Sequence, residues 1–183
     1  MPGNPEGGSA PAVFFDRDGT LMVDVDYCSD PKKVFIHPGV REALQRLKKA
    51  GYKNIVITNQ SGIGRGYMTE AQYRAVEEEV RRQIGADVLD ATYFCPDAPG
   101  QPSTRRKPLP GMVFEAADEH GIDLARSFFV GDKGSDIECG RRAGVRTIFA
   151  LLGSREEPGE PRPDFVAKDV VEAVDIILQN ADV

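Results

Sequence analysis

Short apolar runs that alternate with segments of helical periodicity constrain the fold of this 183-residue chain more than any other feature. The runs at 12–15 and 54–58 are apolar or β-branched, which is typical of buried parallel strands. Between them, Val40, Leu44 and Leu47 recur at helical spacing. Further strands are expected at 91–95, 127–131, 147–152 and 165–167, and further helices at 69–84, 111–120, 139–143 and 169–179. This alternation predicts an α/β fold, a Rossmann-like three-layer sandwich with a mostly parallel central sheet and right-handed crossovers.

Two local signals mark the ends of predicted helices. Thr69 and Gln72 have the spacing of a capping box, in which each side chain binds the other residue's backbone N–H. Gly51 follows the first helical segment and can close it in a left-handed conformation. Gly62, Gly64 and Gly66 are interpreted as a turn that aims residues 58–61, in preference to a phosphate-binding loop.

The composition is that of a folded globular protein, with 40% hydrophobic and 28% charged residues. A single domain is expected over residues 12–183. Residues 1–11 are rich in Gly, Pro and Ser, so we expect a disordered N-terminal lead-in there.

The net charge narrows the kinds of partner that this chain can bind, and the cysteine content indicates its compartment. The net charge is −6, whereas binding to nucleic acid or to an anionic membrane relies on clustered Lys and Arg. The chain has no apolar run of the ~20 residues that a membrane-spanning helix needs. Its three cysteines, Cys28, Cys95 and Cys139, are too sparse for a disulfide framework and favour a reducing compartment. We expect a cytoplasmic monomer that binds a small molecule.

Four polar clusters lie after the predicted strands or in the loops that follow them, at 16–20, 58–61, 105–107 and 132–136. In open α/β sheets, ligands bind outside the carboxyl ends of the strands. The clusters are far apart in sequence, yet this fold brings them to one edge. The sequence therefore predicts a single site there.

Asp16 and Asp18 carry the most chemical information, because Gly19 permits a turn that lets both carboxylates face one site. One carboxylate can attack as a covalent nucleophile and form an aspartyl-phosphate. The second can protonate the leaving oxygen and later activate water. Because two carboxylates repel a phosphate dianion, a cation is required, and Mg²⁺ accepts carboxylate, water and phosphate oxygens. Asp132, after the fourth predicted strand, would complete the metal site.

The remaining polar residues fit charge neutralisation at a phosphoryl group. Lys107 and Lys133 could neutralise its oxygens, and Thr58 and Asn59 could donate hydrogen bonds to them. For Lys133, a structural salt bridge with Asp136 is an equal alternative. Asp136 itself is expected to orient its loop or Lys107.

These residues resemble the four motifs of the haloacid dehalogenase superfamily of phosphatases. The first set that carries the resemblance is Asp16-Arg17-Asp18-Gly19-Thr20, Thr58, Lys107, and Gly131-Asp132 with Asp136. Within the superfamily, the chain is more similar to the D-glycero-D-manno-heptose-1,7-bisphosphate 7-phosphatases and the related histidinol-phosphate phosphatases. The segments that carry this closer similarity are 58–63, 65–66, 106–108, 110–112 and 130–133.

The resemblance implies a role for each matching residue and the absence of a large cap domain. Asp16 would be the nucleophile and a Mg²⁺ ligand, and Asp18 the general acid and base, with its backbone carbonyl on the metal. Asp132 would be the third metal ligand, while Thr58 and Lys107 would hold the transferring phosphoryl group. Substrate contacts would come from Asp24, Asp26, Tyr27, Asn59, Gln60, Ser61, Arg106 and Lys133. The implied reaction is Mg²⁺-dependent hydrolysis of a small sugar (bis)phosphate, with D-glycero-D-manno-heptose 1,7-bisphosphate as the expected substrate.

Two departures from the family pattern stand out. Many of these enzymes hold a structural zinc through Cys-x-His and Cys-x-Cys pairs, which here read Cys95-Pro96-Asp97 and Ser103-Thr104-Arg105. Structural zinc takes four nitrogen or sulfur ligands, so we predict that zinc is absent and that loop 96–110 is held by its prolines or is mobile. Val25-Asp26 stand where the heptose enzymes carry His-Gly, so the sugar need not be the same.

Three alternatives remain open from the sequence. A histidinol-phosphate phosphatase would use the same chemistry on another substrate. A DNA 3′-phosphatase shares the Thr-Asn-Gln segment but needs a basic groove, which a net charge of −6 disfavours. A non-catalytic phosphate-binding protein is the last, and intact Asp16, Asp18, Lys107 and Asp132 argue against it.

Overall fold

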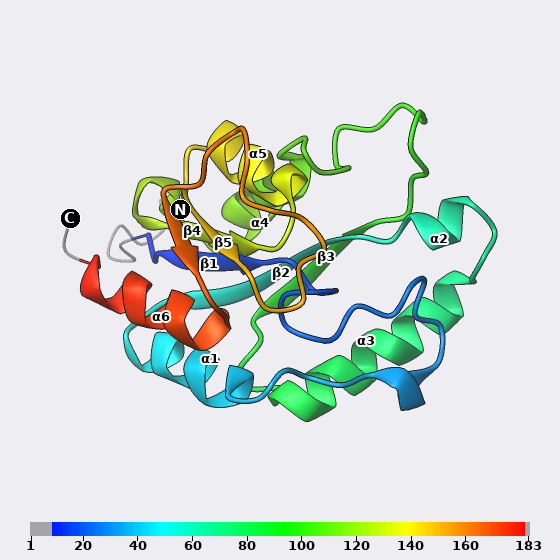
Figure 1. Cartoon of the computed structure of the whole chain (residues 1–183), viewed down its shortest axis with the longest axis horizontal. Coiled ribbons are helices and arrows are strands. Elements are labelled where there is room, and N and C mark those ends of the chain that lie inside the picture. Colours follow the sequence, from blue (N-terminus) through cyan, green and yellow to red (C-terminus); the bar gives the residue numbers. More distant parts are fainter. Residues whose placement is uncertain (1–8, 182–183) are drawn as a thin grey trace, which may run out of the picture.

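A single six-stranded sheet forms the centre of the molecule, and all neighbouring strands in it run parallel (Figure 1). The computed structural model describes residues 9–181. Side by side, the strands are β3 (Ala91–Cys95), β2 (Lys53–Asn59), β1 (Ala12–Phe15), β4 (Phe128–Gly131), β5 (Arg146–Ala150) and β6 (Phe165–Ala167). The predicted α/β fold is confirmed, with a sheet that is parallel throughout.

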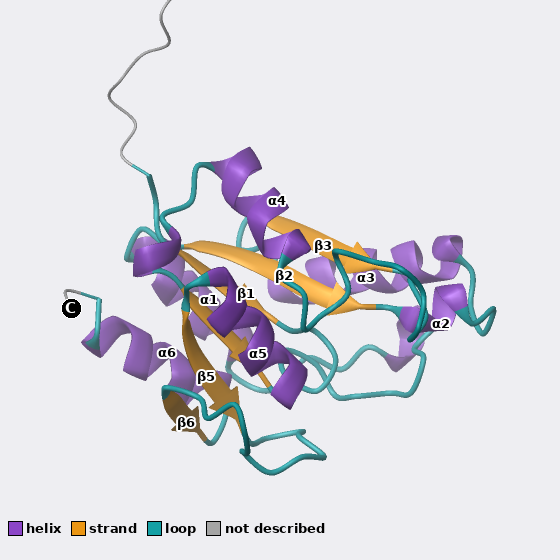
Figure 2. Cartoon of the chain, turned by 90° about the horizontal axis from the view of Figure 1, so that it is seen from above, coloured by secondary structure: helices purple, strands orange, loops and turns teal. Residues whose placement is uncertain are grey.

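Helices cover both faces of the sheet and complete the three layers (Figure 2). One face carries α1 (Val40–Lys49), α3 (Glu70–Ile84) and α6 (Val170–Gln179). The other carries α4 (Gly111–His120) and α5 (Gly134–Ala143). Within residues 9–181 no further domain is inserted, in agreement with the expected lack of a large cap.

The central strand β1 shows why the sheet is buried on both faces. Val13 and Phe15 pack in the core under α1, α3 and α6, while Ala12 and Phe14 pack in the core under α4 and α5. All four side chains are 0% exposed, as expected when successive residues of a strand point to opposite faces. Asp16 follows directly, and its backbone N–H donates to the carbonyl of Val130 on β4 at 3.0 Å. The buried strand and this hydrogen bond thereby fix the position of Asp16 at the carboxyl end of β1.

The local end signals are confirmed, and several short elements are additional. Thr69 Oγ1 accepts the N–H of Gln72 at 3.1 Å, and Gln72 Oε1 accepts the N–H of Thr69 at 2.9 Å. Gly51 has a φ of 88° after α1. Helix α5 begins earlier than the predicted 139–143, because Asp136 Oδ2 accepts the N–H of Lys133 at 3.1 Å and caps an extra turn. The additional elements are α2 (Ser61–Gly64), where a turn was predicted, and the 3₁₀ turns Pro31–Lys33 and Leu124–Arg126.

The N-terminal boundary of the fold differs from the predicted lead-in at residues 1–11. Residues 1–8 lie outside the described residues. The N–H of Ala10 donates to the carbonyl of Gly121 at 3.2 Å, and the carbonyl of Pro11 accepts the N–H of Lys53 at 2.9 Å. These two residues therefore belong to the domain. In the described chain, no helix combines the length and apolarity needed to cross a membrane.

Candidate active site

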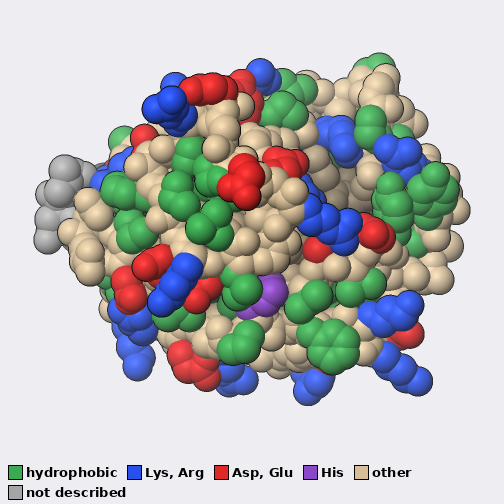
Figure 3. Space-filling view, in the orientation of Figure 1, with side chains coloured by type: hydrophobic (Ala, Val, Ile, Leu, Met, Phe, Trp, Pro, Cys, Tyr) green, Lys and Arg blue, Asp and Glu red, His purple; other side chains and the backbone are tan. Residues whose placement is uncertain are grey.

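The predicted polar clusters meet at the carboxyl ends of β1, β2 and β4, around a pocket of about 290 Å³. Figure 3 shows acidic and basic side chains gathered close together near the centre of the face that it displays. Thr58 and Asp132 are each 1% exposed and do not line the pocket. The predicted site residues that line it are Asp16, Asp18, Asp24, Asp26, Tyr27, Asn59, Gln60, Ser61, Arg106, Lys107 and Lys133.

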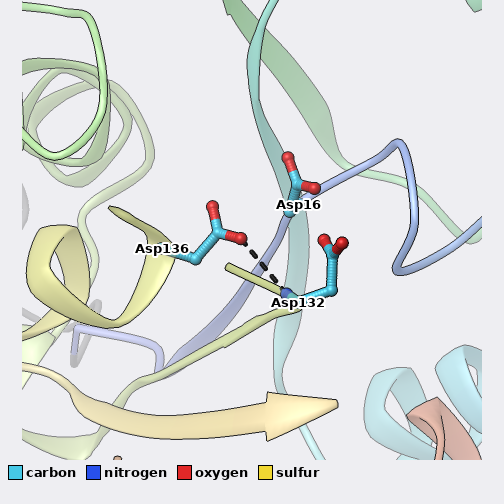
Figure 4. A group of neighbouring side chains, drawn as sticks. All are labelled: Asp16, Asp132 and Asp136. Carbon is cyan, nitrogen blue, oxygen red and sulfur yellow. Dashed lines mark hydrogen bonds between the residues drawn. The ribbon is translucent and has the colours of Figure 1, made fainter. Parts of the chain in front are cut away.

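Three buried carboxylates lie close together at the base of the site (Figure 4). Asp16 comes from the end of β1, Asp132 from the end of β4 and Asp136 from α5, and one oxygen of each lies within 4.8 Å of the others. Asp136 Oδ2 accepts the backbone N–H of Asp132 at 3.2 Å, which is drawn as a dashed line. Among residues 9–181, this is the only such group of His, Cys, Asp or Glu side chains.

Lys107 pairs with two of these carboxylates from a distant loop. Its Nζ donates to Asp16 Oδ1 at 2.6 Å, to Asp136 Oδ1 at 2.7 Å and to the carbonyl of Ile57 at 2.8 Å. Each of the three ammonium hydrogens thus has an acceptor inside the protein, where the side chain is only 3% exposed. Burial works against the charge, but Asp136 and Asp16 raise the pKa of Lys107 above its ordinary value. Lys107 is therefore a fixed positive charge beside Asp16.

The same charges keep Asp16 ionised. Burial alone would raise the pKa of Asp16, but Lys107 and then Lys133 hold it below its ordinary value. Lys133 lines the pocket, and Asp16, Asp132 and Asp24 raise its pKa against the effect of burial. An ionised, lysine-paired carboxylate that faces a pocket is chemically suited to nucleophilic attack.

The surroundings of Asp132 fit a divalent cation. Its Oδ1 accepts the hydroxyl of Thr20 at 2.9 Å, whereas its buried Oδ2 has no hydrogen-bond partner within residues 9–181. Burial and the neighbouring charge of Asp16 raise the pKa of Asp132 to about 9. A Cβ on Gly19 would lie 2.4 Å from Oδ2, so glycine keeps this space open. Because Mg²⁺ binds carboxylate oxygens and would stabilise the ionised form, the residues present fit it.

Asp18 also lines the pocket, and its carboxylate accepts hydrogen bonds from Gln60 and Arg17. Gln60 Nε2 donates to Asp18 Oδ2 at 2.8 Å and also to Thr58 Oγ1 at 2.8 Å. Arg17 donates to both oxygens of Asp18, with distances of 3.3 and 3.2 Å. In this arrangement Gln60 and Thr58, predicted to contact substrate, also orient the second carboxylate.

Asn59 is engaged with the backbone of Lys107. Its Oδ1 accepts the N–H of Lys107 at 3.0 Å, and its Nδ2 donates to the carbonyl of Lys107 at 3.1 Å. The amide thus ties the end of β2 to the loop that carries the lysine. Asn59 still lines the pocket, so a substrate contact stays a prediction for it.

The predicted substrate loop closes one side of the pocket. Asp26 pairs with Arg155 at 3.1 Å, and Asp24 lies 3.8 Å from the same guanidinium. Tyr27 has a φ of 49°, an uncommon conformation for a residue other than glycine, and its ring stacks edge-on against Tyr67 at 4.9 Å. The loop is therefore held at both ends, by an ion pair and by an aromatic contact.

Hydrogen bonds hold the loop in which the sequence resemblance places the family's zinc-binding pairs. Cys95 Sγ lies 3.4 Å from Asp97 Oδ2 and 3.6 Å from Ser103 Oγ. Ser103 Oγ accepts the N–H groups of Arg105 and Arg106 at 3.2 and 3.0 Å. Arg106 Nη1 donates to the carbonyl of Asp97 at 2.9 Å. Polar side chains at the positions of the two expected zinc-binding pairs thus bind one another and place Arg106 at the pocket.

Two residues of the site were not predicted from the sequence. Arg17, between the two motif carboxylates, is 0% exposed and bonds to Asp18. Its sequence signal was its position within the first motif, which gives no hint of burial. Arg155 reaches Asp26 across 129 residues, and its sequence neighbourhood gives no sign of that contact.

Comparison with known proteins agrees with this geometry. The HAD-hydrolase-like family matches residues 104–173. The D-glycero-beta-D-manno-heptose-1,7-bisphosphate 7-phosphatase of Helicobacter pylori is 38% identical over 170 residues, which cover 91% of this chain and 96% of that protein. The enzyme of the same name from Yersinia pestis is 40% identical over 176 residues, covering 90% and 93%.

A solved structure is similar over nearly the whole chain. The D,D-heptose 1,7-bisphosphate phosphatase of B. bronchiseptica, complexed with magnesium and phosphate, superposes with a TM-score of 0.82 at 29% identity, and the match covers 93% of this chain and 99% of that one. The protein is accordingly a phosphatase, a phosphoric monoester hydrolase of the HAD superfamily. Within the superfamily, the chain belongs to the family of the D-glycero-D-manno-heptose-1,7-bisphosphate 7-phosphatases, and the resemblance noted in its motifs is confirmed.

Proposed function

We propose that this phosphatase removes the 7-phosphate of D-glycero-D-manno-heptose 1,7-bisphosphate through an aspartyl-phosphate on Asp16. The observation that carries the chemistry is the buried pair of Asp16 and Lys107, with Nζ and Oδ1 2.6 Å apart at the base of the pocket. The names of the relatives at 38% and 40% identity support the substrate.

In the first step, a carboxylate oxygen of Asp16 attacks phosphorus. The new O–P bond forms as the bond to the sugar oxygen breaks, and Asp18 gives a proton to that leaving oxygen. Lys107 stays within reach of Asp16 and faces the charge that spreads over the phosphoryl oxygens, and Lys133 adds a second positive charge at the pocket wall.

In the second step, Asp18 takes a proton from water, and the hydroxide attacks the phosphorus of the aspartyl-phosphate. The bond to Asp16 breaks, which releases inorganic phosphate and regenerates the carboxylate. Asp16, Asp132 and the backbone carbonyl of Asp18 would hold Mg²⁺, which when bound neutralises charge on the phosphate. Gln60 keeps Asp18 at the pocket through both steps, because its amide bonds to Oδ2 at 2.8 Å.

A second phosphate on the substrate would meet the basic side of the pocket. Arg106 lines the pocket and is fixed there by its bond to the carbonyl of Asp97 at 2.9 Å. Guanidinium groups suit phosphate, because their donors match its oxygens in pairs. This supports a bisphosphate over a monophosphate.

The test is phosphate release in Mg²⁺ from a panel of the heptose bisphosphate, a hexose bisphosphate, histidinol phosphate and a DNA 3′-phosphate, with Asp16→Asn as the inactive control. We expect the heptose bisphosphate to have the highest kcat/KM and phosphorus NMR to show loss of the 7-phosphate. A higher kcat/KM for histidinol phosphate or DNA would reassign the substrate. Equal rates for wild type and Asp16→Asn on every compound would refute the proposed activity.

A further inference from the structure

A buried arginine links the predicted general acid to the body of the domain. The side chain of Arg17 is 0% exposed and lies between two carboxylates, those of Asp18 and Glu77. Asp18 faces the pocket, whereas Glu77 belongs to α3 and lies away from the pocket lining. The guanidinium therefore connects a pocket residue to a helix that carries no predicted site residue.

On the pocket side, Arg17 fixes the direction of the Asp18 carboxylate. Its Nε lies 3.3 Å from Oδ2 and its Nη2 lies 3.2 Å from Oδ1, so both oxygens are engaged. A planar guanidinium bound at two points restricts rotation of a carboxylate, which a single ammonium contact does not.

On the far side, two groups contact Arg17, an ion-pair partner and an aromatic ring, and a third group holds that ion-pair partner. Its Nη1 lies 3.5 Å from Glu77 Oε2, and its guanidinium carbon lies 5.5 Å from the centre of the Tyr73 ring. The hydroxyl of Thr92 on β3 donates to Glu77 Oε1 at 2.6 Å, which fixes the carboxylate in turn. A series of contacts thus connects β3, through Glu77 on α3, to Arg17 and Asp18.

The energetics favour a geometric role for this buried ion group. Removing charges from water costs about as much free energy as their mutual attraction returns, so such a group adds little to folding stability. What it does supply is direction: a carboxylate that must meet a leaving oxygen needs its orientation fixed, and a shift of roughly 1 Å can cost about a hundredfold in rate.

We propose that Glu77 is a positioning residue for catalysis, which acts through Arg17 to hold Asp18 in line with the leaving oxygen. The inference rests on the role of Asp18 in the proposed function. Glu77 would thus support the site from a helix outside the pocket, 59 positions along the chain from Asp18.

Leaving groups of different quality separate this role from a general loss of structure. An alkoxide is a poor leaving group and needs the proton from Asp18, whereas p-nitrophenolate leaves without one. Misplacing Asp18 should therefore lower kcat/KM for a sugar phosphate much more than for p-nitrophenyl phosphate. The ratio of the two values in one preparation is independent of the fraction of enzyme that is folded.

The experiment compares wild type, Glu77→Gln, Asp18→Asn and Glu78→Gln on both substrates with Mg²⁺. Asp18→Asn sets the scale for loss of the acid, and Glu78, an exposed neighbour on the same helix, is the matched control. We expect Glu77→Gln to lower the sugar-phosphate to p-nitrophenyl-phosphate ratio by about tenfold and Glu78→Gln to leave it unchanged. Thr92→Val, which frees the Glu77 carboxylate without removing it, should shift the ratio in the same direction by a smaller factor.

An unchanged ratio in Glu77→Gln, with both rates equal to wild type or both reduced alike, would overturn the inference while the proposed function stands. If wild type released no phosphate from any sugar phosphate, both would fall.

Discussion

Nζ of Lys107 lies 2.6 Å from Oδ1 of Asp16, although the two residues are 91 positions apart in the chain. The same ammonium reaches Asp136 and the carbonyl of Ile57, so it is held from three directions inside the protein. Lys107 therefore presents a fixed positive charge to an incoming phosphoryl group. Electrostatic stabilisation by charges placed before the reaction begins is usually the largest single contribution to catalysis.

Replacement of this lysine tests the contribution directly. Lys107→Met keeps the length of the side chain but removes its charge, and it leaves Asp16 and Asp136 as unpaired buried carboxylates. We expect kcat/KM to fall by about 10²–10³-fold, the usual cost of one preorganised donor. Steady-state kinetics would show this, with Lys49→Met on the exposed surface of α1 as the control. A loss of less than about tenfold would mean that Lys107 serves only to keep the pocket folded.

Gly19 should not tolerate even one added methyl group. Its φ is 89°, and a Cβ there would lie 2.4 Å from Asp132 Oδ2. Gly51→Ala is a closely matched control, because Gly51 has a φ of 88° and, apart from its chain neighbours, no heavy atom of residues 9–181 lies within 4 Å of its Cβ position. Both variants should lose about 1 kcal/mol from backbone strain. Only Gly19→Ala should also lose Mg²⁺-dependent activity, and equal activity in the two would contradict the crowding at Asp132.

Magnesium should stabilise the protein more at higher pH. Burial and Asp16 raise the pKa of Asp132 to about 9 in the metal-free protein, from 3.8. Between these values the unfolded state is ionised while the folded state keeps the proton, so metal-free stability falls as the pH rises. Mg²⁺ binds the ionised carboxylate and removes this loss.

Thermal unfolding at pH 6 and pH 8, with and without Mg²⁺, measures the effect. The increase in Tm on adding Mg²⁺ should be larger at pH 8 in wild type and in Asp118→Asn, an exposed control on α4. In Asp132→Asn the increase should be small at both pH values. A wild-type increase that does not depend on pH would argue that Asp132 is not a cation ligand.

The ion pair of Arg155 and Asp26 should affect substrate binding more than turnover. Arg155 is 60% exposed, and its contacts at 3.1 Å to Asp26 and 3.8 Å to Asp24 hold the substrate loop against residues 151–163. Exposed pairs contribute up to about 1 kcal/mol, so Arg155→Ala should raise KM by about two- to fivefold with kcat nearly unchanged.

Arg162→Ala serves as the control for Arg155, because Arg162 is an exposed arginine that pairs only with nearby Glu160 in the same part of the described chain. A double-mutant cycle with Asp26→Asn gives the coupling energy. If KM changed equally in Arg155→Ala and in Arg162→Ala, the loop would not depend on this pair.

The sequence by itself determined the architecture and the chemistry of the site. Alternating apolar runs specify a parallel sheet, because a strand buried on both faces must be apolar at every position, as β1 is. The capping box of Thr69 and Gln72 and the left-handed Gly51 could be predicted because they depend on neighbours within a few residues. The motif carboxylates could be placed at one edge, because the carboxyl ends of parallel strands converge there.

Only the tertiary structure decided how those side chains are supported. The burial of Arg17 between Asp18 and Glu77 and the reach of Arg155 to Asp26 depend on how α3 and the loops pack, over separations that no local spacing records. The same holds for the loop after Cys95, where Ser103 collects two backbone N–H groups. Spacing along a chain fixes which residues share a strand or a helix face, whereas contacts between elements are settled by packing of the whole core.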